Sequence, residues 1–124
     1  MPTEVNIDID INFDKFIVSD HWQNLKLRIF RDVPELSTVY IRRSSSGNVH
    51  IRVKVRRDLL LLERLCLRAF LDDDPARLAC DLDRFYRTGR AETTDRCFNK
   101  KYSCSQRVIK TAGVWQRVRK NGKY

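Results

Sequence analysis

The chain has 124 residues, a formal net charge of +9, 42% hydrophobic residues and 33% charged residues. This length and apolar content predict one folded domain spanning residues 1–124 and exclude two catalytic domains. The longest apolar run, at residues 59–62, is far shorter than the ~20 residues of a membrane-spanning helix, and no signal-peptide pattern is visible. We therefore expect an intracellular, cytoplasmic protein without a membrane partner.

The N-terminal half predicts three strands and one helix. Apolar and polar residues alternate over 5–14, which indicates a strand with one buried face. Ser19 is placed to cap a helix over 20–31. Strands at 38–42 and 49–56 flank a polar turn and therefore form a hairpin.

The next segment predicts a helical hairpin. Asp58 is expected to cap a helix that continues through Leu71. Asp74, with Pro75 at the first helical position, opens a second helix that Gly89 closes. Beyond this hairpin the pattern is less regular, and the basic C-terminal segment 106–124 is expected to be a partly flexible tail.

The order of these elements predicts an α+β fold. Strand, helix, strand, strand, helical segment and strand match the ferredoxin-like, RNA-recognition-motif-like plan, in which an antiparallel sheet has helices packed on one face. In this plan the first and third strands lie side by side in the centre of the sheet. The polar face of the sheet then presents Asn6, Asp8, Asp10, Asn12, Tyr40, Arg42, His50, Arg52, Lys54 and Arg56.

Basic side chains concentrate in two blocks without acids. Residues 41–57 carry six bases and residues 96–124 carry nine. Such blocks, with aromatic residues in or beside them, predict a DNA or RNA partner whose phosphates they neutralise. A generally basic surface and an anionic membrane surface are the alternatives. We expect nucleic-acid contacts from Tyr40, Arg42, Arg52, Lys54, Arg56, Lys100, Lys101, Arg117 and Arg119.

Two carboxylates and a histidine form a candidate catalytic site. Asp8 and Asp10 are two residues apart on one predicted strand, so their carboxylates point the same way and suit one or two Mg²⁺ or Mn²⁺ ions. His50 lies at the start of the strand predicted over 49–56, four residues after Ser46, and is placed to contact a triphosphate. The alternative is an ordinary solvated strand face.

These residues carry a resemblance to a known family. The motifs Asp8-Ile9-Asp10 and Ser46-Gly47-Asn48-Val49-His50 resemble the first two motifs of archaeo-eukaryotic primases and primase-polymerases. The resemblance implies a metal-dependent nucleotidyltransferase in replication, with Asp8 and Asp10 holding the metals. It also implies that His50 and a serine such as Ser46 contact a nucleoside triphosphate, and it suggests an archaeal, viral or mobile-element source.

The resemblance covers about residues 5–55 and departs from the family later in the chain. The family's third motif places an aspartate after a hydrophobic residue, whereas Asn99 stands at the matching position here. A non-catalytic nucleic-acid-binding or regulatory module that uses only its basic surface is therefore the alternative. A rolling-circle type nuclease would need a second histidine beside His50.

The four cysteines are predicted to pair. Cys66 and Cys80 lie symmetrically about the centre of the helical hairpin. Cys97 and Cys104 lie symmetrically about Lys100 and Lys101, which we expect to form the turn between two short strands. This spacing predicts two disulfides or two buried thiol pairs, which would suit a thermophilic source. A zinc site would need shorter spacings between its cysteines.

Overall fold

The computed structural model describes residues 3–89, 100–102 and 108–124. Its elements confirm the α+β class, and no helix in these ranges is long and apolar enough to cross a membrane. In chain order the elements are β1 (Thr3–Ile9), α1 (Phe13–Phe16), α2 (Asp20–Asp32), β2 (Leu36–Arg43), β3 (Val49–Val55), α3 (Leu61–Phe70), α4 (Pro75–Thr88), β4 (Lys100–Tyr102), β5 (Val108–Thr111) and β6 (Gln116–Val118).

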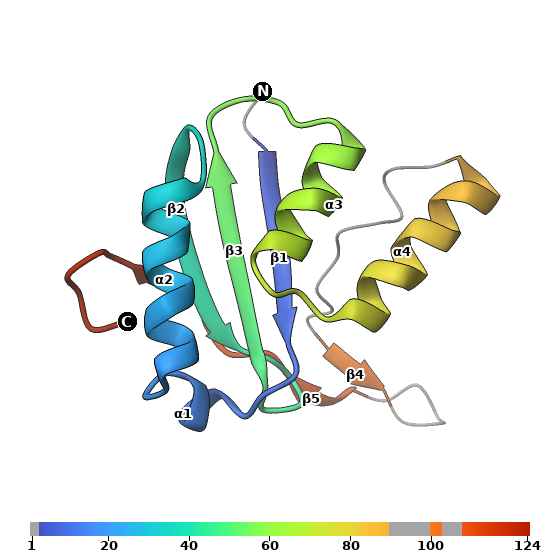
Figure 1. Ribbon diagram of the computed structural model, residues 1–124. Helices are drawn as coiled ribbons and strands as arrows, with labels where there is room; N and C mark the ends of the chain where they lie inside the picture. Colours follow the sequence, from blue (N-terminus) through green and yellow to red (C-terminus); the bar gives the residue numbers. More distant parts are fainter. Residues whose placement is uncertain (1–2, 90–99, 103–107) are drawn as a thin grey trace.

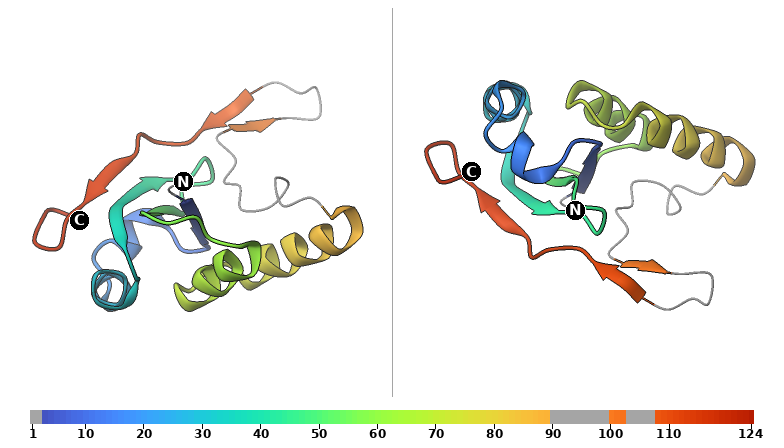
Figure 2. Two further views of the ribbon diagram at one scale, coloured as in Figure 1. Left: turned by 90° about the horizontal axis from the view of Figure 1, so that it is seen from above. Right: turned by 90° about the horizontal axis from the view of Figure 1, so that it is seen from below.

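The main sheet is antiparallel, with the strand order β1-β3-β2-β6 (Figure 1). Helices α2 and α3 cover one face of this sheet, and the segment that joins β5 to β6 passes on the other side (Figure 2). The neighbours β1, β3 and β2 follow the ferredoxin-like plan, while β6 adds to the β2 side. Among the described strands β1 is therefore at an edge, and β3 and β2 are central, which corrects the expected central position of β1.

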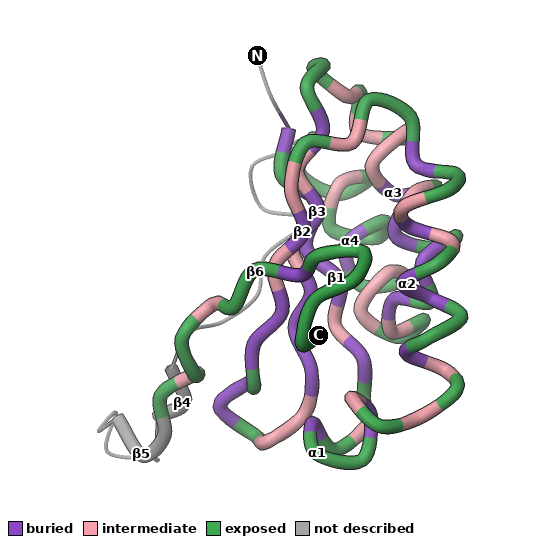
Figure 3. The backbone as a smooth tube through the Cα atoms, turned by 90° about the vertical axis from the view of Figure 1, so that its left-hand side faces the viewer, coloured by how far each residue is buried: buried purple, intermediate pink, exposed green. Residues whose placement is uncertain are grey.

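The core follows directly from the alternation of apolar residues along the strands. Every second residue of β1 and β3 faces the helices. Helix α2 packs against these strand residues with Trp22, Leu25 and Ile29, which recur at helical spacing. The buried residues gather between the sheet and these helices (Figure 3). The fully buried apolar side chains are those of Val5, Ile7, Phe16, Trp22, Leu25, Ile29, Ile41, Val49, Ile51, Val53 and Leu71.

Three of the expected helix boundaries are confirmed. The Ser19 hydroxyl accepts the backbone N–H of Trp22 at 3.2 Å and starts α2. Asp74 caps α4, with Pro75 at its first turn, and Gly89 ends α4 in the left-handed conformation with φ 66°. These ends use local chemistry, so the sequence alone identifies them.

Two other boundaries differ from expectation. Strand β1 ends at Ile9, because the chain turns over residues 10–12 and the Asn12 side chain caps α1. Helix α3 begins at Leu61 and is not capped by Asp58. Its first turn instead uses Glu63, whose carboxylate accepts the backbone N–H of Leu60 at 3.0 Å.

The expected pairing of Cys66 with Cys80 is wrong, because both thiols are free and exposed. Cys66 lines a groove with Asp32 and Val33 at the end of α2, whereas buried Arg68 makes an ion pair with Asp81 on α4. Lys100 and Lys101 also differ from expectation, since they belong to β4, which pairs with β5. Cys97 and Cys104, like Asn99, lie outside the described residues.

Candidate nucleic-acid interface

The open face of the sheet carries a row of polar side chains across four strands. Tyr40 on β2 lies opposite Arg52 on β3 and opposite Arg117 on β6, and Arg52 lies opposite Asn6 on β1. Directly opposed residues of antiparallel strands point to the same face. Lys54, two residues further along β3, shares this face. We call the four residues Tyr40, Arg52, Lys54 and Arg117 the sheet-face row.

Ion pairs and hydrogen bonds hold two cations of this row in place. The Nε of Arg52 donates to the side-chain oxygen of Asn6 at 3.0 Å. The Glu4 carboxylate lies 3.5 Å from Arg52 and 3.2 Å from the Nζ of Lys54. The Lys54 ammonium also lies 5.4 Å from the centre of the Tyr40 ring. The row therefore combines positive charge with a half-buried aromatic ring on two central strands.

Trp115 joins this face from the segment that precedes β6. The Cζ atom of Arg42 lies 4.2 Å from the centre of the Trp115 ring, and that of Arg52 lies 4.4 Å from it. Both distances are within the cation–π range. The backbone N–H of Gly113 donates to the carbonyl of Arg43 at 2.8 Å and fixes the approach of the segment. In the sequence Trp115 is one of the aromatic residues of the basic block 96–124 and forms an apolar patch with Val114.

His50 is buried beneath this face, with 5% of its surface exposed. The Nε of Arg42 donates to its Nδ1 at 3.2 Å, so a neutral His50 carries its proton on Nε2. Burial lowers the pKa of His50 to about 4, and the guanidinium groups of Arg42, Arg77 and Arg52 act in the same direction. The imidazole is therefore neutral at pH 7.

The carboxylate of Asp8 lies 3.9 Å from the Nε2 of His50. This distance is too long for a hydrogen bond. Burial and the three guanidinium groups outweigh the attraction of the Asp8 carboxylate for a protonated imidazole, so His50 stays neutral. Burial also raises the pKa of Asp8; Arg77 opposes that shift, and neighbouring carboxylates including Asp73 add to it. Asp8 and His50 are therefore neighbours, as the sequence predicted.

Asp10 lies beyond the end of β1 and is exposed, with its Oδ1 accepting from the Asn48 side chain at 2.8 Å. Asp73 and Asp74 approach Asp8 through its backbone: Asp8 N–H donates to the Asp73 carboxylate at 2.6 Å, and Asp74 N–H donates to the Asp8 carbonyl at 2.8 Å. The Asp74 side chain is occupied as the cap of α4. The sequence predicts both residues at a helix start, with the run Asp72-Asp73-Asp74 as an alternative source of the third metal ligand.

These donors do not assemble a complete metal centre. In the described ranges no group of three or more histidine, cysteine, aspartate or glutamate side chains is arranged to hold a metal ion. The Asp73 carboxylate already accepts from Arg68, Arg77 and the backbone of Asp8. The Mg²⁺ or Mn²⁺ site at Asp8 and Asp10 stays a prediction, and no step below depends on it.

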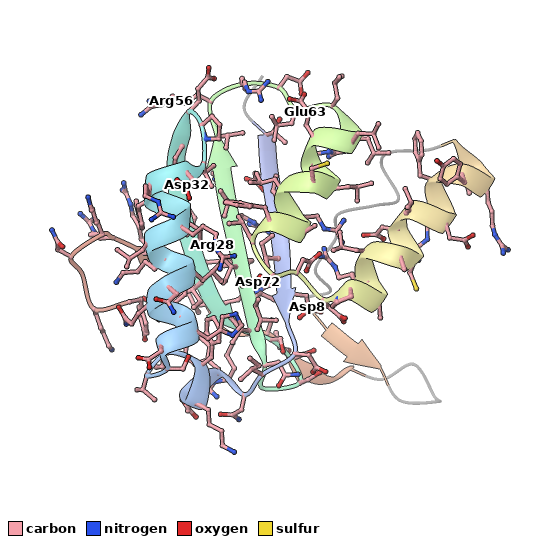
Figure 4. The ribbon with its side chains drawn as sticks, viewed as in Figure 1. Asp8, Arg28, Asp32, Arg56, Glu63 and Asp72 are labelled. Atoms are coloured by element: carbon pink, nitrogen blue, oxygen red, sulfur yellow. The ribbon has the colours of Figure 1, made fainter. Side chains whose placement is uncertain are left out.

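The remaining predicted contact residues are dispersed. Ser46 is exposed in the turn between β2 and β3, which the Ser44 hydroxyl holds together. Arg56 and Asp8 lie at opposite ends of the sheet (Figure 4). Arg119 is exposed just after β6, and of Lys100 and Lys101 only the backbone, on β4, is described.

Comparison of the chain with family models, with curated proteins and with solved structures found no match.

Proposed function

We propose that the protein binds single-stranded nucleic acid on the open face of its sheet. The observation that carries this proposal is the sheet-face row, in which Arg52, Tyr40 and Arg117 lie side by side on three neighbouring strands. Cations beside an aromatic ring suit a ligand that offers both phosphates and unpaired bases.

Charge across the face favours one path for the strand. Glu4, Asp8 and Asp10 lie on or just after β1, whereas Arg117 and Arg119 lie on or just after β6. Phosphates are repelled by the first group and attracted by the second. We infer that the sugar-phosphate backbone follows β2 and β6, with the bases directed toward Tyr40 and β3.

Single strands fit this arrangement better than duplexes. A base stacks on an aromatic ring only when its own faces are free, and such stacking contributes about 1–3 kcal/mol per base. In a duplex the base faces are covered by neighbouring pairs, and a protein reaches only the groove edges and phosphates. A single strand is therefore expected to use Tyr40, and a duplex of the same length is not.

The test is binding of a fluorescein-labelled 12-residue oligothymidine, measured by fluorescence anisotropy over a series of salt concentrations. The double variant Arg117→Gln, Arg119→Gln, which removes two exposed cations on and just after β6, is expected to bind at least about tenfold more weakly near 0.1 M salt. The plot of log K against log salt has a negative slope, and each lost phosphate contact reduces its magnitude by about 0.7. The magnitude should therefore decrease by about 1.4 in the double variant.

A matched control removes two charges from the helical layer. The double variant Arg84→Gln, Arg87→Gln changes the net charge equally, but both residues lie on α4, away from the row. Its affinity and salt slope are expected to equal those of the wild type. Equal weakening by both double variants would show only nonspecific attraction, and absence of binding by the wild type would refute the proposal.

A further inference from the structure

Trp115 covers the two guanidinium groups at the centre of the proposed binding face. Arg42 and Arg52 both lie within cation–π distance of its indole, and Arg42 retains only 5% of its surface exposed. The segment that joins β5 to β6 passes on the open side of the sheet (Figure 2), so an indole this close to both guanidinium groups stands on the side from which a strand would approach. The most central positive charge of the face is thus already matched by a ring of the protein itself.

We propose that the Trp115 side chain is an intramolecular competitor of the nucleic acid. In the free protein the indole stacks against the guanidinium groups of Arg42 and Arg52. When a strand binds, a nucleobase replaces the indole at this position. This inference rests on the proposed function and specifies how that same site is regulated. The ligand is a base with an exposed aromatic face, because such a base makes the same stacking contact with a guanidinium that the indole makes.

The backbone around Trp115 allows this exchange without unfolding the segment. On one side the N–H of Gly113 is bonded to the carbonyl of Arg43, and on the other side Gln116 pairs with Ile41. Both anchors are backbone contacts, so rotation of the Trp115 side chain is enough to move the indole. The Trp115 residue is itself partly exposed, so solvent already reaches it in the free protein.

The position that the indole leaves stays preorganised. His50 accepts from the Nε of Arg42, and Asn6 accepts from the Nε of Arg52. Neither bond involves Trp115, so both guanidinium groups keep their orientation when the indole rotates away. An incoming base then meets two fixed guanidinium groups, which reduces the entropy lost on binding.

The first test is the oligothymidine affinity of Trp115→Ala. Two cation–π contacts no longer compete with the base, and the affinity should rise about tenfold relative to the wild type. Val114→Ala is the matched control, because it removes an exposed side chain of the same segment, and it should leave the affinity unchanged. An unchanged or lower affinity of Trp115→Ala would overturn the inference.

A second measurement keeps Trp115 in place and follows it directly. The chain has two tryptophans, and Trp22 is fully buried in the core. In protein labelled with 5-fluorotryptophan, the Trp115 fluorine resonance, assigned with Trp115→Phe, should gain solvent exposure when oligothymidine is added. The Trp22 resonance should stay unchanged. Solvent exposure is measured as the shift between H₂O and D₂O.

The outcomes separate this inference from the proposed function. Loss of solvent exposure at Trp115 on binding would mean that the indole stacks on the bases, and it would overturn competition while binding itself stands. If the wild type does not bind oligothymidine, the proposed function fails and the inference fails with it.

Discussion

Replacement of Asp73 by alanine is expected to destabilise the protein by about 3–5 kcal/mol, because it leaves a buried cation without its main partner. The Asp73 side chain is fully buried and accepts from the Nε of Arg68 at 2.7 Å and from Arg77 at 2.8 Å. Arg68 is itself fully buried, and the Asp81 carboxylate lies 2.8 Å from its Nη1. Asp73 also accepts the backbone N–H of Asp8 and so joins α3 and α4 to the edge of the sheet.

The measurement is urea unfolding followed by circular dichroism and by the fluorescence of the buried Trp22. Asp72→Asn is the matched control, because Asp72 is the adjacent carboxylate but is partly exposed, where it pairs with His21 and Arg28. Asparagine tolerates the positive φ of 63° at this position. The control should lose less than about 1 kcal/mol. A loss at Asp73 no larger than at Asp72 would contradict a stabilising role of the buried network.

The hairpin of β2 and β3 is the part of the interface that the sequence predicts best. Alternation of apolar and polar residues determines which side chains share a face, and a short polar turn determines which residues face each other. The placement of Tyr40, Arg52 and Lys54 together follows from these two local rules. The same rules extend the first strand too far, because Asn12 acts as a helix cap and interrupts the alternation after Ile9.

Trp115 and Asp73 could not be assigned in this way. Each acts through residues far along the chain: Trp115 reaches Arg42 and Arg52, and Asp73 reaches the backbone of Asp8. Neither contact follows a period or a capping pattern. The order of strands decides both contacts, because β6 lies beside β2 and the loop before α4 lies at the β1 edge.

His50 shows how burial changes the role of a residue that the sequence locates correctly. The motif placed it beside Asp8 on the polar face, where an exposed imidazole would titrate near its ordinary pKa. In the fold its Nδ1 is occupied by Arg42, and its ring is covered. We therefore interpret His50 as a positioning residue for Arg42, and contact with a phosphate would require its exposure.

Acidification from pH 6.5 toward 4 is expected to cost about 3 kcal/mol of stability through His50 alone. In the unfolded chain the imidazole gains a proton near its ordinary pKa of 6.5, whereas in the folded protein it stays neutral until about pH 4. The unfolded state binds more protons across this window, so the free energy of unfolding falls as the pH falls. The figure follows from the lowered pKa, at 1.36 kcal/mol per pH unit.

The groups around His50 determine the shape of this profile. Arg42, Arg52 and Arg77 stay charged throughout, so the repulsion that opposes protonation is constant. The raised pKa of Asp8 acts in the opposite direction, because a folded protein that holds a proton on Asp8 gains stability as the pH falls below that pKa. The loss from His50 should therefore be steepest in the middle of the window, and a proton held by Asp8 in the folded protein offsets part of the net loss toward its acidic end.

The measurement is urea unfolding at a series of pH values for the wild type and for His50→Gln. Glutamine does not titrate, and its side-chain oxygen can accept from the Nε of Arg42 in place of Nδ1. The difference between the two proteins cancels the groups that titrate alike in both. The free energy of unfolding of the wild type minus that of His50→Gln should decrease steadily as the pH falls from 6.5. A difference that is independent of pH would mean that His50 titrates alike in both states, and its burial beneath the arginines would then not hold in solution.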